Sequence, residues 1–524
     1  MREEQVDVLV TGAGLGGLSA TMFLAQQGVR VLTIERHAST ALHPRASGQS
    51  PRTMELFRWA GIDEEVLGVS KRASQGLRIT IASSLGGQVF HSLLQDMAEI
   101  DLSAAAGTPW GMAGQEMVEP IMLARAEKSG ADVRFSTTLT SFEQDGEGVT
   151  AVVEPPDGEP YRVRARYLVA ADGGRSRIRE RLGIETTGLG GIADSIGVVF
   201  EADLGDRMQP DVTDLYYLRN PSFTGALVNT DGPGRYVFGT DYHPERGETL
   251  ADYPEERLVE LIRLATDLPE LRPEIRWAGA WEMAARIARE FRSGRVFLVG
   301  DAAKVTPPTG GMGGVTAVGD GHDLAWKLAA VLRGEAGPGL LDTYEAERRP
   351  IAQMVVDTSL HNAKERLKPE LDLTGVGEPT DQIGIALGFR YRSSAVLADD
   401  DDPSPVENPN EPSGRAGFRA PHVPFGDGRS IVDLLGHGWV LLANGPGWHA
   451  AANDVSAAAG VAIACHEAGV DFADPERVFA ARYGLDEGGA SLVRPDGIVG
   501  WRRTAAVDDK AGPLWDAFGA LLRR

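Results

Sequence analysis

The sequence predicts an α/β protein with three parts: a Rossmann-like nucleotide-binding domain, a mixed-sheet middle domain and a small C-terminal α/β domain. Residues 6–36 run as apolar strand, Gly-rich turn, helix and second apolar strand, which is how a doubly wound sheet begins. Residues 195–245 alternate apolar and polar positions between Gly, Pro and Asn breaks, as antiparallel strands do. Beyond residue 414, two strand-like runs flank a helical stretch, which indicates a separate α/β unit.

The nucleotide-binding domain is expected to be discontinuous. A second strand–loop–helix unit, RVFLVGDAAK followed by TPPTGGMGG and a helical run, lies late in the chain. A charged, Pro-rich stretch at 400–414 resists packing and is typical of a linker or an extended wrap. The expected boundaries are 1–180 and 285–400 for the nucleotide-binding domain, 181–284 for the middle domain with a contribution from 70–105, and 401–524 for the C-terminal domain.

Composition limits the possible partners. The chain has 524 residues, of which 42% are hydrophobic, enough for two or three packed cores. Its formal net charge of -23 repels phosphate backbones, although a basic cleft for a pyridine nucleotide remains compatible with it. The start of the chain shows no targeting signal, and no run approaches the roughly 18 apolar residues of a membrane span. We therefore expect a soluble, cytoplasmic protein without a nucleic-acid or membrane partner.

Cysteine and histidine usage narrows the chemistry further. Cys465 is the single cysteine, which excludes intramolecular disulfides, CxxC redox pairs and Cys-rich zinc sites. The ten histidines show no HxxxH or HExxH spacing, so no metal is expected. There is no GxSxG motif, so a hydrolase would have no nucleophile elbow.

A dinucleotide fingerprint occupies the first strand–turn–helix unit. Gly12, Gly14 and Gly17 form GxGxxG, and Glu35 ends the next strand. Gly12 permits the tight turn, Gly14 lets backbone N–H groups approach a pyrophosphate, and Gly17 lets the helix pack against the strand. The helix N-terminus adds partial positive charge. Glu35 is placed to bind a ribose, and its carboxylate disfavours a 2′-phosphate, so the motif predicts FAD or NAD rather than NADP.

Two further segments distinguish FAD from NAD. RVFLVGDAAKVTPPTGGMGG resembles the flavin segment of the aromatic-ring hydroxylases built like p-hydroxybenzoate hydroxylase, and YLVAADGGRSRIRERLGI resembles their DG segment, with Asp172, Gly173, Ser176 and Arg179 matching. GDAAKVTPPTGGM, GFRYRSSAVLA, PSGRAGFRAPHV and SLVRPDGIVGWR are most similar to the anthracycline-type polyketide hydroxylases, the aklavinone hydroxylases among them. Lys304 and Val315 depart from the wider family, which commonly has His and Asn at these positions.

The resemblance implies a non-covalent FAD and assigns residues to it. Asp301 would bond the ribityl chain, and the loop after it would pass its N–H groups along the flavin pyrimidine edge. The helix beginning near Val315 would point its positive end at the same edge. The full set of expected FAD-binding residues is Gly12, Gly14, Leu15, Gly16, Gly17, Glu35, Arg36, Arg45, Gln115, Leu139, Asp301, Gly311, Met312, Gly313 and Gly314.

The resemblance also implies a reaction. NADPH, bound transiently, reduces FAD, O₂ forms a flavin C4a-hydroperoxide, and its distal oxygen attacks an electron-rich ring of a phenolic polycyclic polyketide. A Tyr from DLYYLRN and an Arg from GFRYRSS are expected to manage the phenolic proton. Tyr216 and Tyr217 point to opposite faces of a strand, so one can face the substrate. We expect Tyr216, and prefer Arg390 over Arg392 because it is nearer to the apolar GF.

Several alternatives stay open at the level of sequence. A Baeyer–Villiger or drug-inactivating oxygenase would use the same flavin loops and differ only in pocket shape. A flavin-bearing protein that binds an aromatic antibiotic without turnover, and a plain NAD dehydrogenase, are less favoured. The C-terminal domain resembles the thioredoxin-like tail of these hydroxylases; without a CxxC its role would be packing or assembly, in a monomer or a homodimer.

Overall fold

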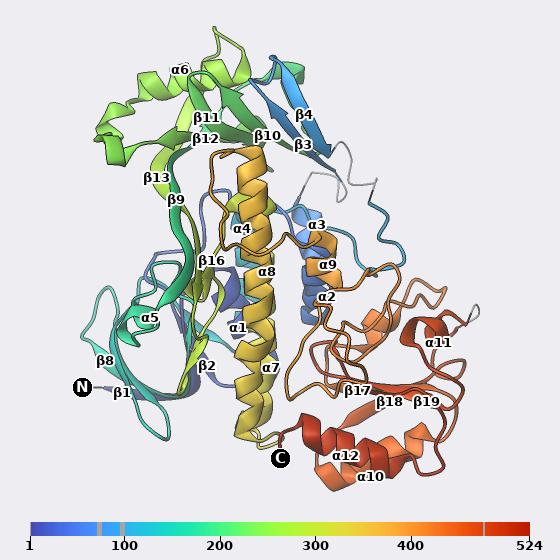
Figure 1. Cartoon of the computed structure of the whole chain (residues 1–524). Coiled ribbons are helices and arrows are strands. Elements are labelled where there is room, and N and C mark those ends of the chain that lie inside the picture. Colours follow the sequence, from blue (N-terminus) through green and yellow to red (C-terminus); the bar gives the residue numbers. More distant parts are fainter. Residues whose placement is uncertain (1, 71–75, 95–99, 475–476) are drawn as a thin grey trace.

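Three β-sheets organise the chain, which is described here from a computed structural model of residues 2–70, 76–94, 100–474 and 477–524. In Figure 1 the first sheet lies at the lower left, the second sheet at the top and the third at the lower right, with the long helices in the centre. Parts of the expected contribution from 70–105, namely 71–75 and 95–99, lie outside the described residues.

The first sheet contains the parallel strands expected for nucleotide binding, with antiparallel pairs at its edges. Its strands follow the order β14-β15-β8-β1-β2-β5, with β6 and β7 joined through β8. Val8, Leu9 and Val10 are fully buried, as expected for a central strand between two parallel neighbours. The strands are β1 (Glu3–Thr11), β2 (Val31–Ile34), β5 (Asp132–Arg134), β6 (Thr138–Gln144), β7 (Val149–Glu154), β8 (Tyr161–Ala170), β14 (Arg292–Ser293) and β15 (Val296–Leu298).

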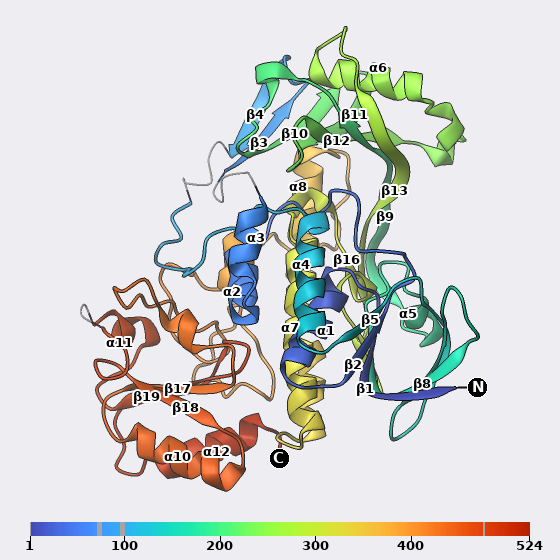
Figure 2. The same cartoon turned by 180° about the vertical axis from the view of Figure 1, so that it is seen from behind.

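Helices from distant parts of the sequence pack around this sheet. Helices α7 and α8 are long and lie side by side through the centre of the molecule, as both views show (Figures 1 and 2). The helices of this part are α1 (Leu15–Gln26), α2 (Pro51–Ala60), α3 (Asp63–Val69), α4 (Gln115–Lys128), α5 (Arg177–Arg181), α7 (Gly313–Leu332), α8 (Thr343–Arg366) and α9 (Gln382–Leu387).

The second sheet has the antiparallel pairs that the alternating pattern predicts, and it is mixed because β10 pairs parallel with β3. Its order is β16-β13-β9-β12-β11-β10-β3-β4, so residues 77–94 do join it. Helix α6 (Glu255–Thr266) covers one face and buries Leu258, Leu261 and Ile262 there. The strands are β3 (Leu77–Ala82), β4 (Val89–Leu94), β9 (Thr186–Glu201), β10 (Thr213–Asn220), β11 (Phe223–Asn229), β12 (Arg235–Tyr242), β13 (Glu274–Ala288) and β16 (Lys304–Val305).

The third sheet forms the C-terminal domain. Its order is β18-β17-β19-β20, with β17 parallel to β18 and antiparallel to β19. This β-α-β-α-β-β-α connectivity is consistent with the expected thioredoxin-like domain. Cys465 lies half-buried on β18. The elements are β17 (Trp439–Asn444), α10 (Trp448–Ala459), β18 (Ile463–Glu467), α11 (Val478–Tyr483), β19 (Gly489–Val493), β20 (Val499–Arg503) and α12 (Ala511–Leu521).

A buried ionic network joins this domain to the central helices. Glu347 of α8 accepts hydrogen bonds from Lys327 of α7 at 2.6 Å and from both terminal nitrogens of Arg494 at 2.6 and 2.8 Å. Lys327 also donates to Asp323, and Arg494 also donates to Asp496. The three carboxylates lie within 4.8 Å of one another. Both cations lie among these carboxylates in a site closed to solvent, so the buried charges are paired there.

The Pro-rich segment is an extended wrap rather than a free linker. The side chain of Asp400 accepts two hydrogen bonds from Arg390, and Arg415 donates to Asp402.

None of the helices that the structure describes is long and apolar enough to cross a membrane.

Candidate cofactor and substrate site

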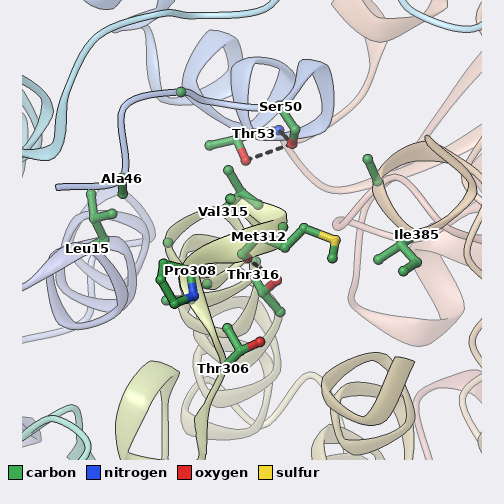
Figure 3. A pocket seen from close by; sticks show the side chains of 18 of the residues that line it. Leu15, Ala46, Ser50, Thr53, Thr306, Pro308, Met312, Val315, Thr316 and Ile385 are labelled. Atoms are coloured by element: carbon green, nitrogen blue, oxygen red, sulfur yellow. Dashed lines mark hydrogen bonds between the residues drawn. The ribbon is translucent and has the colours of Figure 1, made fainter. Parts of the chain in front are cut away.

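A cavity of about 710 Å³ lies between the first and second sheets and is the place where the motifs meet. One end is lined by the GxGxxG turn and the loop that precedes α7. The other end is lined by the second sheet, the end of α8 and α9. In Figure 3, Leu15 and Ala46 lie on one side of the loop residues Pro308 and Met312, and Ile385 of α9 lies on the other.

The GxGxxG turn has the close approaches that its glycines predict. Gly12 adopts φ +100°, and a Cβ there would lie 2.2 Å from the carbonyl oxygen of Ala171. A Cβ at Gly17 would lie 1.9 Å from the carbonyl oxygen of Gly12. Gly14 lines the cavity at the start of α1, whose first turn carries no acidic side chain. The cavity therefore meets a helix N-terminus free to bind an anion.

The loop before α7 forms the facing wall. Asp301 is open to the cavity but surrounded by protein, so its lost hydration raises the pKa of the carboxyl, while the charges of Lys304 and Arg45 oppose the rise. Helix α7 begins at Gly313 without a side-chain cap or an acidic residue in its first turn. Its free N–H groups and positive end therefore face a ligand in the cavity.

A chain of buried polar groups supports this loop from behind. Asp320 accepts hydrogen bonds from Lys304 at 3.1 Å, from the backbone N–H of Gly300 at 3.2 Å and from Arg348 at 2.7 Å. Arg348 also donates to the carbonyl oxygen of Thr316 in the first turn of α7. Lys304 thus has a structural partner here, which explains how the chain accommodates a lysine at this position.

The DG segment is tied to the same loop. Ser176 donates to Asp172 at 2.6 Å and caps α5 by accepting from the N–H of Arg179. The guanidinium of Arg179 is buried and donates to the carbonyl oxygen of Ala302 at 3.1 Å. Gly173 lines the cavity. Asp172 and Arg179 therefore hold the segment in place, while the backbone at Gly173 reaches the site.

Most of the residues expected to bind the cofactor line this cavity, and four do not. Glu35 instead accepts hydrogen bonds from the N–H groups of Ala13 and His37, at 2.8 and 2.9 Å. Gln115 lines the cavity, and its amide nitrogen donates to Glu119. The lining residues are Gly14, Leu15, Gly16, Gly17, Arg45, Gln115, Asp301, Gly311, Met312, Gly313 and Gly314, whereas Gly12, Glu35, Arg36 and Leu139 do not reach it. The individual cofactor contacts stay predictions.

The structure does not place Tyr216 at the cavity. Its ring belongs to the core between the second sheet and α6, and its hydroxyl accepts a hydrogen bond from Arg78 at 3.2 Å. Leu215 and Tyr217 point to the opposite face of β10 and line the cavity. The alternation of the strand was correctly predicted, but the face expected to meet the substrate was wrong.

Arg390 is also absent from the cavity wall. Its side chain is buried and bonds to Asp400 and to the carbonyl oxygens of Asp402 and Ala416. Arg390 thus holds the wrapping segment 400–414 in place. Arg392, two residues further along the chain, is exposed. The expected pairing of Tyr216 with Arg390 is therefore wrong as a placement.

A different tyrosine–arginine pair lies at the substrate end. The guanidinium carbon of Arg366, at the end of α8, lies 5.7 Å from the ring centroid of Tyr217. Burial raises the pKa of Tyr217, and the positive charge of Arg366 opposes that rise. Arg366 is held by the carbonyl oxygen of Thr309 and by Asn362, and its Nε is buried without a partner among the described residues. No sequence motif around residue 366 predicts that Arg366 lies beside Tyr217 at the cavity.

Removal of Asp301 tests the cofactor end. We expect Asp301→Ala to weaken FAD binding by about 1–3 kcal/mol, because the cofactor loses a hydrogen bond to a charged carboxylate. The measurement is the dissociation constant of FAD, titrated into apoprotein by flavin fluorescence. Asp157→Ala, in an exposed turn between β7 and β8, is the matched control. Unchanged FAD affinity in Asp301→Ala would show that this carboxyl does not contact the cofactor.

Known proteins share both the sequence and the fold. A family model described as an FAD binding domain matches residues 5–359, and one described as the C-terminal part of aromatic-ring hydroxylases matches residues 413–522. Aklavinone 12-hydroxylase RdmE of Streptomyces purpurascens is 50% identical over 100% of both chains. Tetracenomycin A2 monooxygenase-dioxygenase of Streptomyces glaucescens is 39% identical over 100% of this chain and 98% of its own. The solved ternary complex of aklavinone-11 hydroxylase with FAD and aklavinone is 49% identical, with a TM-score of 0.94 over 100% of both chains.

Proposed function

This chain belongs to the FAD-dependent aromatic-ring hydroxylases, and on that basis we propose that it hydroxylates a phenolic ring of an anthracyclinone-type aromatic polyketide. The expectations of an FAD cofactor and of monooxygenase activity are confirmed by this membership. One observation carries the substrate proposal: the cavity continues from the GxGxxG turn into a largely apolar chamber that contains Tyr217 and Arg366. A flat polycyclic phenol suits such a chamber, because apolar walls bind its rings and few polar groups orient it.

The residues present fit FAD. Two helix N-termini without acidic side chains, those of α1 and α7, open onto one cavity, and Asp301 lines the same cavity. Gly14 and Gly16 would admit the pyrophosphate, and Gly313 and Gly314 the pyrimidine edge of the flavin. We propose non-covalent binding, since Cys465 lies on β18 and does not line the cavity. When bound, FAD supplies electron transfer from the nicotinamide nucleotide and activation of O₂.

The residues of the chain handle the substrate proton. The charge of Arg366 stabilises a phenolate and so lowers the pKa of a phenol placed beside it. Tyr217, held at the same place, would orient the phenolic oxygen and relay its proton. A phenolate ring is richer in electrons at its ortho and para carbons, which are the carbons that accept oxygen. The closed apolar walls exclude water from the reacting atoms.

The reductant is proposed to be NADPH, bound transiently beside the flavin. Only one GxGxxG occurs in the chain, so the nicotinamide nucleotide has no Rossmann domain of its own. Arg175, Arg177 and Arg181 of the DG region are exposed and available for a phosphate, whereas Arg179 is buried. We expect kcat/KM for NADPH to exceed that for NADH. Equal values for the two would remove the case for recognition of the 2′-phosphate.

The substrate proposal is tested with anthracyclinone and angucyclinone aglycones. Purified holoenzyme is mixed with each aglycone, NADPH and ¹⁸O₂, and products are analysed by mass spectrometry. We expect one labelled oxygen on an intact ring and faster NADPH oxidation when substrate is present. A labelled lactone or ring-opened product would identify Baeyer–Villiger chemistry instead. NADPH oxidation that no aromatic substrate stimulates would contradict the proposal.

A further inference from the structure

Helix α9 forms one wall of the substrate end of the cavity, and a single polar side chain interrupts it. Ile383, Ile385 and Ala386 give this wall an apolar surface, and Gln382 at the start of the helix lines the cavity beside them. The amide nitrogen of Gln382 is buried and has no hydrogen-bond partner among the residues that the structure describes. A buried amide N–H without a partner is costly, and most such groups in proteins are paired.

The position of Gln382 relates it to the proposed tyrosine–arginine pair. The amide nitrogen of Gln382 lies 3.4 Å from the place that a Cβ of Gly310 would occupy. The preceding residue, Thr309, accepts a hydrogen bond from Arg366 through its carbonyl oxygen. The guanidinium that faces Tyr217 and the amide of Gln382 therefore border neighbouring residues of one loop.

Helix α9 and the GxGxxG turn lie on opposite sides of the loop that precedes α7. In Figure 3 the labelled residue of α9, Ile385, lies across the loop from Leu15, which belongs to the GxGxxG turn. Gln382 lines the same cavity as Tyr217 and Arg366. Three further polar atoms of the cavity wall have no hydrogen-bond partner among the described residues: the Nε of Arg366, the hydroxyl of Thr306 and one carboxylate oxygen of Asp323. The two nitrogens of this set, in Gln382 and Arg366, are hydrogen-bond donors, so the ligand that satisfies them must offer acceptor oxygens.

We propose that Gln382 is a specificity residue that donates a hydrogen bond to a ring carbonyl of the substrate. This inference rests on the proposed function and adds a chemical requirement to it. The preferred substrate is a phenol that also carries a ketone or quinone oxygen on the same ring system. The phenolic oxygen lies at Tyr217 and Arg366, and the carbonyl oxygen lies at Gln382. A phenolic polycycle without the carbonyl leaves the amide unpaired and binds less tightly.

The test compares two ligands with the same three-ring skeleton. Oxidised holoenzyme is titrated with 1-hydroxyanthraquinone, which has carbonyls, and with 1-hydroxyanthracene, which has none, and binding is followed by the flavin absorbance. We expect Gln382→Leu to weaken binding of the quinone about tenfold and binding of 1-hydroxyanthracene less than about twofold. Gln382→Glu, which replaces the N–H by oxygen, should weaken quinone binding at least as much. Full flavin occupancy of both variants shows that they are folded.

Ile385→Val is the matched control, because it removes one methyl group from the same wall and should affect the two ligands equally. Equal losses for both ligands in Gln382→Leu, or no loss for the quinone, would overturn the assignment. These titrations need no NADPH and no turnover. A wild-type enzyme that binds the quinone through Gln382 but does not hydroxylate it would contradict the proposed function and leave this assignment intact.

Discussion

Tyr217→Phe should slow hydroxylation by about 10²–10⁴-fold, the usual contribution of a general acid–base group, while flavin reduction stays near the wild-type rate. Reduction needs only contact with the nicotinamide nucleotide, whereas oxygen transfer needs an electron-rich phenolate ring. The electrons that no longer reach the substrate should appear as hydrogen peroxide. The measurement is product and peroxide formed per NADPH consumed. Arg366→Met should give the same uncoupling, because it removes the charge that stabilises the phenolate.

Tyr216→Phe is the matched control for this experiment. It removes the same hydroxyl from the neighbouring residue, on the face of β10 that packs toward α6. Its product yield per NADPH should equal that of the wild type. Full coupling in Tyr217→Phe and Arg366→Met would mean that the proton leaves by another route. A loss confined to Tyr216→Phe would contradict the placement of these two side chains.

Arg494→Met should lower the free energy of unfolding by about 3–5 kcal/mol, since removing one partner of a buried ion network leaves unbalanced charge behind. Arg494 is fully buried and donates to both Glu347 and Asp496. Without it, three carboxylates close to one another share the single cation Lys327. Unfolding in urea, followed by flavin fluorescence and circular dichroism, measures the loss.

Arg503→Met serves as its control, because Arg503 is exposed on β20 and no ion pair of its side chain exists among the described residues. It should change the free energy of unfolding by no more than about 0.5 kcal/mol. Equal stability of the two variants would show that the buried network contributes little beyond its packing.

The cofactor end of the site could be predicted from the sequence because its determinants are local. Gly12, Gly14 and Gly17 act within one turn, and at Gly12 and Gly17 a Cβ would collide with the backbone. Asp301 and the loop after it follow the same logic, since one strand, one loop and one helix place them. The type of the fold, and the membership of β3 and β4 in the second sheet, were predicted in the same way.

The substrate end could not be predicted, because it depends on packing between distant segments. Tyr216 and Tyr217 are both large and both buried, so the sequence indicates two faces of β10 without saying which one α6 covers. Arg366 ends a helix of 24 residues, and only the direction of that helix brings its guanidinium to Tyr217. Arg390, on an apolar-flanked motif, was the more visible arginine, yet its carboxylate partner Asp400 lies ten residues further on in a segment expected to be a linker or an extended wrap.

The turn between β19 and β20 limits how the C-terminal domain can be exchanged between related enzymes. Asp496 and Ile498, both from the C-terminal domain, form part of the cavity wall, and Asp496 shares Arg494 with Glu347 of α8. Exchange of this domain between two related hydroxylases would therefore replace part of the cavity wall. It would also replace Arg494, the partner of Glu347 in α8. The buried charges of a chimera would stay paired only if Asp323, Lys327 and Glu347 were exchanged together with the C-terminal domain. Exchange of this domain alone is therefore a poor route to a new substrate range, because it leaves buried charges unpaired.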